Sequence, residues 1–324
     1  MGASAGEEMS IEAIKKQLLA IPEIAAWPEI AALVEKPLRQ QLINCFDYPG
    51  IAARSLGQGV AGTWPASAAI LCSLASIHLV DDMLDEDPRG AYHKWGAGKA
   101  ANIALALQAT AAQVLAENAP PERQAALHRC LAKMSIATAW GQQLDAEDHP
   151  GEEAYWRTTR LKTPPLFGGA LELGALLAGA PDSLAAAIGA LGLPIGEMIQ
   201  VNDDLHDALE VPACPDWFRQ GGNLAILYAR LAPHPQRERF EALRQRVSDE
   251  KALREAQDLM IECGGVSYCA YSLLEIYKKG RKMVDELDVV DRAPLIELVD
   301  CQVQAVLELL RKLGVAAPEE LLRS

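Results

Sequence analysis

The sequence contains little of three things: aromatic side chains, cysteine pairs and clustered positive charge. Aromatic residues make up 5% of the 324 positions, although half of the positions are hydrophobic and Ala and Leu dominate. Because helices favour Ala and Leu while strands favour β-branched and aromatic residues, this composition predicts helices. The net charge of −14 and the lack of a basic stripe exclude nucleic acid as an expected partner. An anionic substrate must therefore be bound through metal ions or a local Lys/Arg group.

Signals for export and for a membrane are also missing. The seven cysteines form no CxxC pair, and several lie in apolar helical runs where Cys acts as a small hydrophobic residue. The acidic N-terminal segment lacks the apolar core of a signal peptide. An odd number of cysteines without such a signal predicts a reducing cytoplasm. No run of 18 uncharged apolar residues occurs, so we expect no membrane span.

Apolar residues recur at helical spacing through most of the chain, and no alternating strand pattern lasts beyond a few residues. We expect a single all-α domain over residues 1–324, with its longest helices around a central apolar cavity. The expected helices are 10–20, 28–46, 65–84, 97–117, 121–145, 152–160, 165–179, 182–207, 222–231, 235–244, 249–263, 265–286, 292–313 and 317–323. The expected loops contain Tyr48-Pro49-Gly50, Asp87-Pro88-Arg89-Gly90, Ala119-Pro120-Pro121, His149-Pro150-Gly151 and Gly221-Gly222.

Two aspartate clusters, Asp81–Asp85 and Asp203–Asp207, share the pattern DDxxD and lie 122 residues apart. Each follows an apolar run, Ile70–Val80 before the first and Leu191–Val201 before the second. On a helix, the first and last aspartates of each cluster lie on one face, with the middle one about 100° round the axis. Like charges at this spacing repel each other by a few tenths of a kcal/mol. The clusters therefore do not serve helix stability.

Carboxylates in this pattern suit a hard divalent cation. Mg²⁺ takes one or two carboxylates together with waters and phosphate oxygens. Two facing carboxylate stripes would hold two or three Mg²⁺ ions around one diphosphate. The alternative is that each cluster is a solvated helix end. That reading fits one cluster more readily than two copies of one spacing, both at the ends of apolar helices.

Further segments follow in a fixed order between about residues 65 and 290. They are Ile77–Asp85, Gly141–Asp145, Glu153–Tyr155, Lys162-Thr163 with Leu166–Ala180, Gln200–Asp207 and Cys263–Ala270. In order and spacing the chain resembles the isoprenyl diphosphate synthase (polyprenyl synthetase) family. The resemblance implies the class I isoprenoid synthase fold, a helical bundle around a deep apolar cavity, and a homodimer.

The resemblance also assigns roles. It implies a Mg²⁺-dependent prenyltransferase that ionises an allylic prenyl diphosphate, with three ions around the bound diphosphate. Metal ions, Lys and Arg stabilise the charge of the leaving diphosphate, and a dry cavity protects the allylic cation. The implied metal ligands are Asp81, Asp85 and Asp203. The implied catalytic residues are Asp81, Asp82, Asp85, Lys162 and Asp203. The implied substrate-binding residues are Arg89, Lys162, Thr163, Gln200, Asp204 and Asp207.

Three departures from the family concern the second substrate. Where the family has Gly-Gly-Lys-x-x-Arg-Pro, the segment Tyr48–Ser55 retains only Arg54. The Arg-Arg pair after the first motif is reduced to Pro88-Arg89-Gly90, and Gly221–Ala225 replaces a Gly-Lys-x-Thr segment. The acceptor is therefore isopentenyl diphosphate held differently, or another nucleophile. Residues that would compensate are His93, Lys94 and Lys99.

Small side chains precede the first motif. In the family, a bulky aromatic residue four or five positions before this motif limits the length of the product. Here Ser76 and Ile77 occupy those positions, with Cys72 and Ser73 one turn deeper. An open pocket floor favours a chain of twenty carbons or more.

Three alternatives stay open. A class I terpene cyclase needs no second substrate, but Asp207 and Val211 occupy the positions of Ser/Thr and Glu in the cyclase motif. A non-catalytic regulatory subunit of a heteromeric prenyl synthase usually loses its aspartate motifs, and both are intact here. An acidic calcium-binding or scaffold protein leaves the segments around Lys162 and Gln200 unexplained. The sequence therefore favours prenyl transfer.

Overall fold

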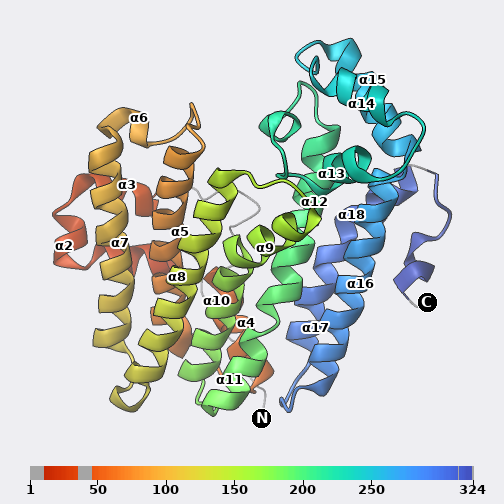
Figure 1. The fold of residues 1–324 in the computed structure, drawn as a ribbon. Helices are drawn as coiled ribbons and strands as arrows, with labels where there is room; N and C mark the ends of the chain where they lie inside the picture. Colours follow the sequence, from red (N-terminus) through yellow and green to blue (C-terminus); the bar gives the residue numbers. More distant parts are fainter. Residues whose placement is uncertain (1–10, 36–45, 313, 323–324) are drawn as a thin grey trace. The chain divides into compact units, whose positions relative to one another are not determined.

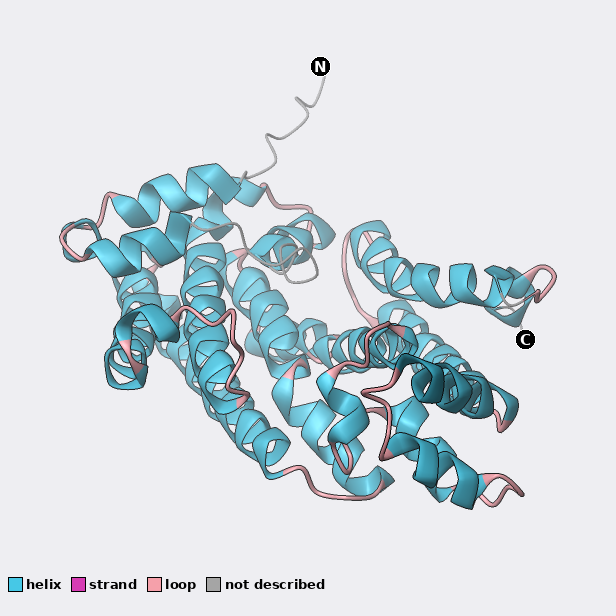
Figure 2. Cartoon of the chain, turned by 90° about the horizontal axis from the view of Figure 1, so that it is seen from above, coloured by secondary structure: helices cyan, strands magenta, loops and turns pink. Residues whose placement is uncertain are grey.

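The structure, a computed structural model, describes residues 11–35, 46–312 and 314–322. These ranges consist of helices and connecting loops and contain no strand, which confirms the all-α prediction (Figure 1, Figure 2). Contacts between residues divide the chain into two compact units. Unit 1 comprises residues 1–139, 165–192 and 284–296, and unit 2 comprises residues 140–164, 193–283 and 297–324. The single-domain organisation stays a prediction.

The α-helices are α1 Ile11–Leu19, α2 Pro22–Ala25, α3 Pro28–Glu35, α4 Tyr48–Ser55, α5 Trp64–Leu84, α6 Tyr92–Trp95, α7 Ala97–Asn118, α8 Gln124–Glu147, α9 Glu152–Lys162, α10 Pro164–Leu177, α11 Asp182–Gly189, α12 Gly192–Leu209, α13 Leu224–Leu231, α14 Arg237–Arg244, α15 Glu250–Glu262, α16 Gly265–Glu286, α17 Ala293–Asp300 and α18 Gln304–Lys312. Short 3₁₀ helices are η2 Val60–Thr63, η3 Pro121–Arg123, η4 Pro215–Phe218, η5 Cys301–Val303 and η6 Pro318–Leu322.

The predicted helix 265–286 matches α16, and most other predicted helices agree with the structure to within a few residues. The helix predicted at 182–207 is wrong as a single element, because α11 and α12 are separate helices. Pro194 lies in the first turn of α12, where proline is tolerated since its missing N–H has no partner there. The helix predicted at 292–313 is likewise divided into α17 and α18 by η5. Residues 36–45 of the helix predicted at 28–46 lie outside the described ranges.

The loop predicted at Tyr48-Pro49-Gly50 is also wrong. These residues begin α4, with Pro49 in its first turn. Proline has a backbone angle that suits the first turn of a helix, so it marks a helix start as readily as a break.

In unit 1, α5 packs along α7 (Figure 1). Most of α5 is buried, including a series of small side chains that lets the two helices approach closely. The Ser76 hydroxyl donates to the carbonyl oxygen of Ala104 on α7, with an O···O distance of 2.9 Å. The sequence of a helix that is buried on all sides is a continuous apolar run, and the sequence of α5 has this pattern. It carries the first aspartate motif at its C-terminal end.

Two stretches are long and apolar enough to cross a membrane, judged by length and composition alone. They are Val60–Leu84 and Asp182–Leu209. In the structure, 72% of the first window and 56% of the second are buried. Core helices of soluble proteins have the same composition, so both are weak evidence for a span. The absence of a membrane span stays a prediction.

In unit 2, glycines bring two helices, α8 and α12, close to the end of α9. A Cβ atom on Gly141 of α8 would lie 2.2 Å from the backbone nitrogen of Lys162. A Cβ atom on Gly196 of α12 would lie 2.7 Å from the Cα of Pro164, two residues further on. Both distances are far below van der Waals contact, so only glycine permits these approaches. The glycines therefore fix the position of Lys162 between α8 and α12.

The helices α13, α14 and α15 of unit 2 pack against one another. The ring of Trp217, in η4, lies 6.0 Å from that of Phe240 on α14, and both side chains are fully buried. This aromatic pair anchors the loop between α12 and α13 in the core of unit 2.

Candidate active site

The first aspartate motif ends α5 in unit 1. Asp81 and Asp82 are half-buried on the last turn, and Asp85, whose N–H donates to the Asp81 carbonyl oxygen at 2.9 Å, is exposed. In the loop that follows, Asp87 accepts hydrogen bonds from Nε and Nη2 of Arg89, at 3.1 and 3.0 Å. The Arg89 side chain is 79% exposed. The loop thus holds a solvent-exposed cation, paired with Asp87, one turn beyond the motif.

The second motif lies near the C-terminal end of α12 in unit 2. Burial and the neighbouring Asp207 raise the pKa of Asp203 to about 7. Burial also raises the pKa of Asp207. Carboxylates that are desolvated beside one another favour the neutral form until a cation compensates their charge. The donor set of Asp203 and Asp207 therefore fits a hard divalent cation.

The middle residue of the second motif has a different environment. Asp204 is completely buried, and its carboxylate accepts hydrogen bonds from Nε2 of Gln200 at 2.8 Å and from the N–H of Leu224 at 2.7 Å. The Asn223 side chain donates to the Asp204 carbonyl oxygen at 2.8 Å and caps α13 by accepting from the N–H of Ala225. These bonds tie α12 to α13. The bonds of Asp204 to Leu224 and Asn223 thus have a structural role, and the substrate-binding roles of Asp204 and Gln200 stay predictions.

Lys162 lies at the last position of α9 and binds Asp145 of α8. Its ammonium group donates to Oδ2 of Asp145 at 2.6 Å, and Nη2 of Arg219 donates to Oδ1 at 2.7 Å. Burial alone would raise the pKa of Asp145, but the charges of Lys162 and Arg219 outweigh it and the pKa is lowered. Asp145 thus stays ionised and holds both cations. Thr163, the residue after Lys162, is half-buried at the C-terminal cap of α9.

Two residues of this region, Arg219 and Asp216, were not predicted from the sequence. Both lie in the loop between α12 and α13, where the sequence shows only that Gly221–Ala225 lacks the family's lysine. Burial raises the pKa of Asp216 to about 6, and Asn223 donates to its carboxylate at 3.3 Å. Pairing of Arg219 with Asp145 joins positions 74 residues apart. No spacing within the loop reports such a pair.

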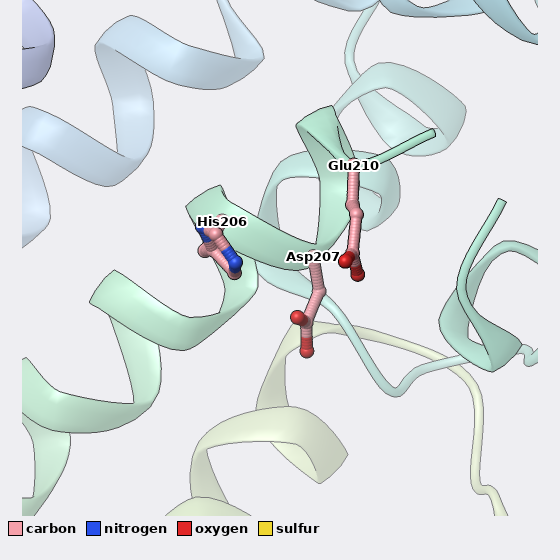
Figure 3. Close-up of side chains that lie close together, drawn as sticks. All are labelled: His206, Asp207 and Glu210. Atoms are coloured by element: carbon pink, nitrogen blue, oxygen red, sulfur yellow. The ribbon is translucent and has the colours of Figure 1, made fainter. Parts of the chain in front are cut away.

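At the end of α12, His206, Asp207 and Glu210 come together (Figure 3). One ligand atom of each lies within 4.8 Å of the others. His206 and Glu210 are exposed, and Asp207 is half-buried. The structure therefore adds two donor groups beside the last aspartate of the second motif. The first motif lies in unit 1 and the second in unit 2, so their convergence on one substrate stays a prediction.

Comparisons with known proteins show the family. The polyprenyl synthetase family model matches residues 63–260, more than half of the chain. A geranylgeranyl pyrophosphate synthase from Geoglobus acetivorans is 28% identical over 270 residues, which cover 77% of this chain and 82% of that protein. A geranylgeranyl diphosphate synthase from Methanosarcina mazei is 27% identical over 267 residues, covering 77% and 81%. The crystal structure of a decaprenyl diphosphate synthase from Rhodobacter capsulatus has a TM-score of 0.76 at 22% identity, and covers 92% of this chain and 94% of that one.

The chain belongs to the polyprenyl synthetase family. Its fold is the helical bundle of the isoprenyl synthases, as the sequence predicted. The protein is a prenyltransferase, and prenyl diphosphates are the substrates that the family implies. The acidic groups described above suit metal-dependent catalysis.

Proposed function

We propose that this prenyltransferase is a Mg²⁺-dependent geranylgeranyl diphosphate synthase. It ionises an allylic prenyl diphosphate and joins the allylic cation to isopentenyl diphosphate. The observation that carries the proposal is the match to the family along residues 63–260, which includes both intact aspartate motifs and Lys162. The two relatives named above as geranylgeranyl diphosphate synthases support the product.

The metal ligands that we propose are Asp81 and Asp85 of the first motif and Asp203 of the second, with three ions in the loaded enzyme. Their carboxylates are hard oxygen donors, and the raised pKa of Asp203 is the mark of a carboxylate that a cation would stabilise in its ionised form. Bound Mg²⁺ would stabilise the negative charge of the departing diphosphate as a Lewis acid. Asp82, Asp204 and Asp207 act around this set, Asp204 by holding α12 to α13.

Lys162 is the protein's own cation for the allylic diphosphate. The close approach of Gly141 fixes its backbone, and Asp145 fixes its side chain. A cation positioned before the reaction stabilises the developing charge without reorganisation at the moment of ionisation. Thr163 and Arg89 complete the groups that we assign to the diphosphate.

The binding of isopentenyl diphosphate differs from the family pattern. Arg54 pairs with Asp47 at 3.4 Å, and Lys99 pairs with Glu29. The retained Arg54 and one of the compensating residues, Lys99, therefore already contact carboxylates. Isopentenyl diphosphate must compete with these pairs, which predicts weak binding of the second substrate.

The small residues before the first motif support a product of twenty carbons. Cys72, Ser73 and Ser76 are buried in α5, so this part of the helix carries small side chains and no aromatic residue of its own. We therefore expect a product chain of four isoprene units to contact these small side chains rather than an aromatic ring.

One assay tests the proposal. The purified protein is incubated with Mg²⁺ and geranyl, farnesyl or geranylgeranyl diphosphate, with and without isopentenyl diphosphate, and the lipids are identified by mass spectrometry. Elongation that requires isopentenyl diphosphate and stops at twenty carbons supports the proposal. A hydrocarbon formed from the allylic substrate alone indicates a terpene cyclase. Absence of turnover with every substrate indicates a regulatory subunit.

We also propose that the enzyme is a cytoplasmic homodimer. On α7 and α8 of unit 1, Leu105 and Ile136 are 69% and 70% exposed. The two helices are linked by Ser135, whose hydroxyl donates to Gln108 at 3.0 Å. Leu105 and Ile136 are the most exposed large apolar side chains of α7 and α8, and we assign them to the dimer interface.

A further inference from the structure

Arg219 in unit 2 is an arginine whose hydrogen-bonding capacity is only partly used. Its side chain is 23% exposed, and it follows η4 in extended conformation. Nη2 donates to a carboxylate oxygen and to the carbonyl oxygen of Asp145, while Nε lies 3.6 Å from Oδ1 of Asp148. A guanidinium has five N–H donors. Among the residues that the structure describes, Nη1 has no hydrogen-bond partner.

The surroundings of Arg219 place it beside the proposed diphosphate site. Lys162 binds the other oxygen of the same Asp145 carboxylate. The charges of Asp207 and Arg219 both act on Asp216, whose pKa is raised first of all by burial. Arg219 and Lys162 therefore share one carboxylate, with Asp216 within reach of the charge of Arg219. An arginine in such a place presents a planar fork that matches phosphate oxygens better than an ammonium group does.

We propose that Arg219 is a second protein cation for the diphosphate of the allylic substrate. It acts together with Lys162, and Asp145 positions both side chains. This inference rests on the proposed function, because it assigns a further residue to the same diphosphate.

Another role for Arg219 would be to anchor the loop, and the structure shows how that role is already filled. Nη1 of Arg244 donates to the Trp217 carbonyl oxygen at 2.9 Å, and this side chain is 5% exposed. Nη2 of Arg230 donates to Oε1 of Gln220 at 2.8 Å. Two other arginines thus hold the loop on either side of Arg219. Arg230 is the matched control, because it contacts the same loop through a guanidinium without reaching Asp145.

The experiment compares Arg219→Gln, Arg219→Lys and Arg230→Gln with the wild type. The probe is inorganic pyrophosphate in the presence of Mg²⁺, and its Kd is measured by isothermal titration calorimetry. The KM for the allylic diphosphate, kcat and the melting temperature are measured alongside. Loss of a charge-assisted contact to phosphate predicts a Kd for pyrophosphate about ten- to a hundredfold higher in Arg219→Gln. The Kd of Arg230→Gln for pyrophosphate should stay within about twofold of the wild-type value. Its melting temperature should be at least as low as that of Arg219→Gln.

The outcomes separate the two proposals. If Arg219→Gln and Arg230→Gln change the Kd by the same factor, Arg219 only anchors the loop and the inference is overturned. If Arg219→Gln does not fold, Arg219→Lys decides: a Kd raised about three- to tenfold supports the inference, and an unchanged Kd overturns it. A wild-type protein that forms no prenyl product and binds no pyrophosphate with Mg²⁺ refutes the proposed function instead.

Discussion

Replacing Gly141 by alanine tests how the site is positioned, without touching any charged group. The added Cβ would lie 2.2 Å from the backbone nitrogen of Lys162 and 2.3 Å from the carbonyl carbon of Leu161. Backbone atoms cannot rotate away as a side chain does, so α9 must move by about 1 Å to restore van der Waals contact. Crowding of this kind costs about 1–3 kcal/mol of stability.

The same displacement moves Lys162 away from Asp145. In the wild type, Nζ of Lys162 lies 2.6 Å from Oδ2 of Asp145. A misplacement of about 1 Å in a catalytic group lowers the rate by about a hundredfold. Gly141→Ala should therefore lower kcat by about that factor while the protein still folds. The assay is a steady-state measurement of prenyl transfer, together with thermal unfolding followed by circular dichroism.

Gly98→Ala is the matched control. Gly98 lies in α7, and a Cβ there would meet no atom within 4 Å. An alanine in an open helical position is neutral or stabilises by up to about 1 kcal/mol. If Gly141→Ala retains the activity and melting temperature of Gly98→Ala, the close contact between α8 and α9 does not position Lys162, and the reasoning is refuted.

Further predictions concern the metal, the ion pair and the dimer. Asp81→Ala and Asp203→Ala should each lower kcat by about a hundredfold or more with little change in melting temperature, and near-normal turnover of either variant would show that the metal ligands are assigned wrongly. The pKa of Asp145 is lower in the folded protein than in the unfolded chain, where it is about 4. The ion pairs of Asp145 therefore stabilise the fold fully above about pH 4, and this stabilisation is lost as the pH falls through the pKa of the folded state. Urea unfolding of Asp145→Asn should thus show a deficit against wild type at pH 7 that shrinks below pH 4. The double variant Leu105→Glu and Ile136→Glu should sediment as a monomer, and an unchanged dimer would place the interface elsewhere.

Much of the fold follows from helical periodicity. The ends of α16 agree with the prediction because the apolar pattern there is strong and Gly264, with φ of +96°, ends the preceding segment. The break between α11 and α12 was missed because the apolar run continues across it, and the weaker signal of Pro194 was not used. Tyr48-Pro49-Gly50 was misread because proline both begins and interrupts helices.

The site was predicted less completely, for a physical reason. Spacing along a helix places Asp203 and Asp207 on one face, and the structure shows both half-buried there. Spacing places Asp204 about 100° round the axis from them but does not report that it is fully buried. Arg219 was missed because its partner, Asp145, lies 74 residues away and belongs to another helix. Contacts of this kind depend on tertiary packing alone.

The bond network around Asp204 has a consequence for reading such motifs in other chains. Both oxygens of its carboxylate accept hydrogen bonds at the junction of α12 and α13, one from the Gln200 side chain and one from the backbone N–H of Leu224. Loss of metal chemistry alone would leave this carboxylate with its hydrogen bond to the start of α13. An aspartate retained at the centre of the motif is therefore evidence for the junction of α12 and α13 as well as for catalysis.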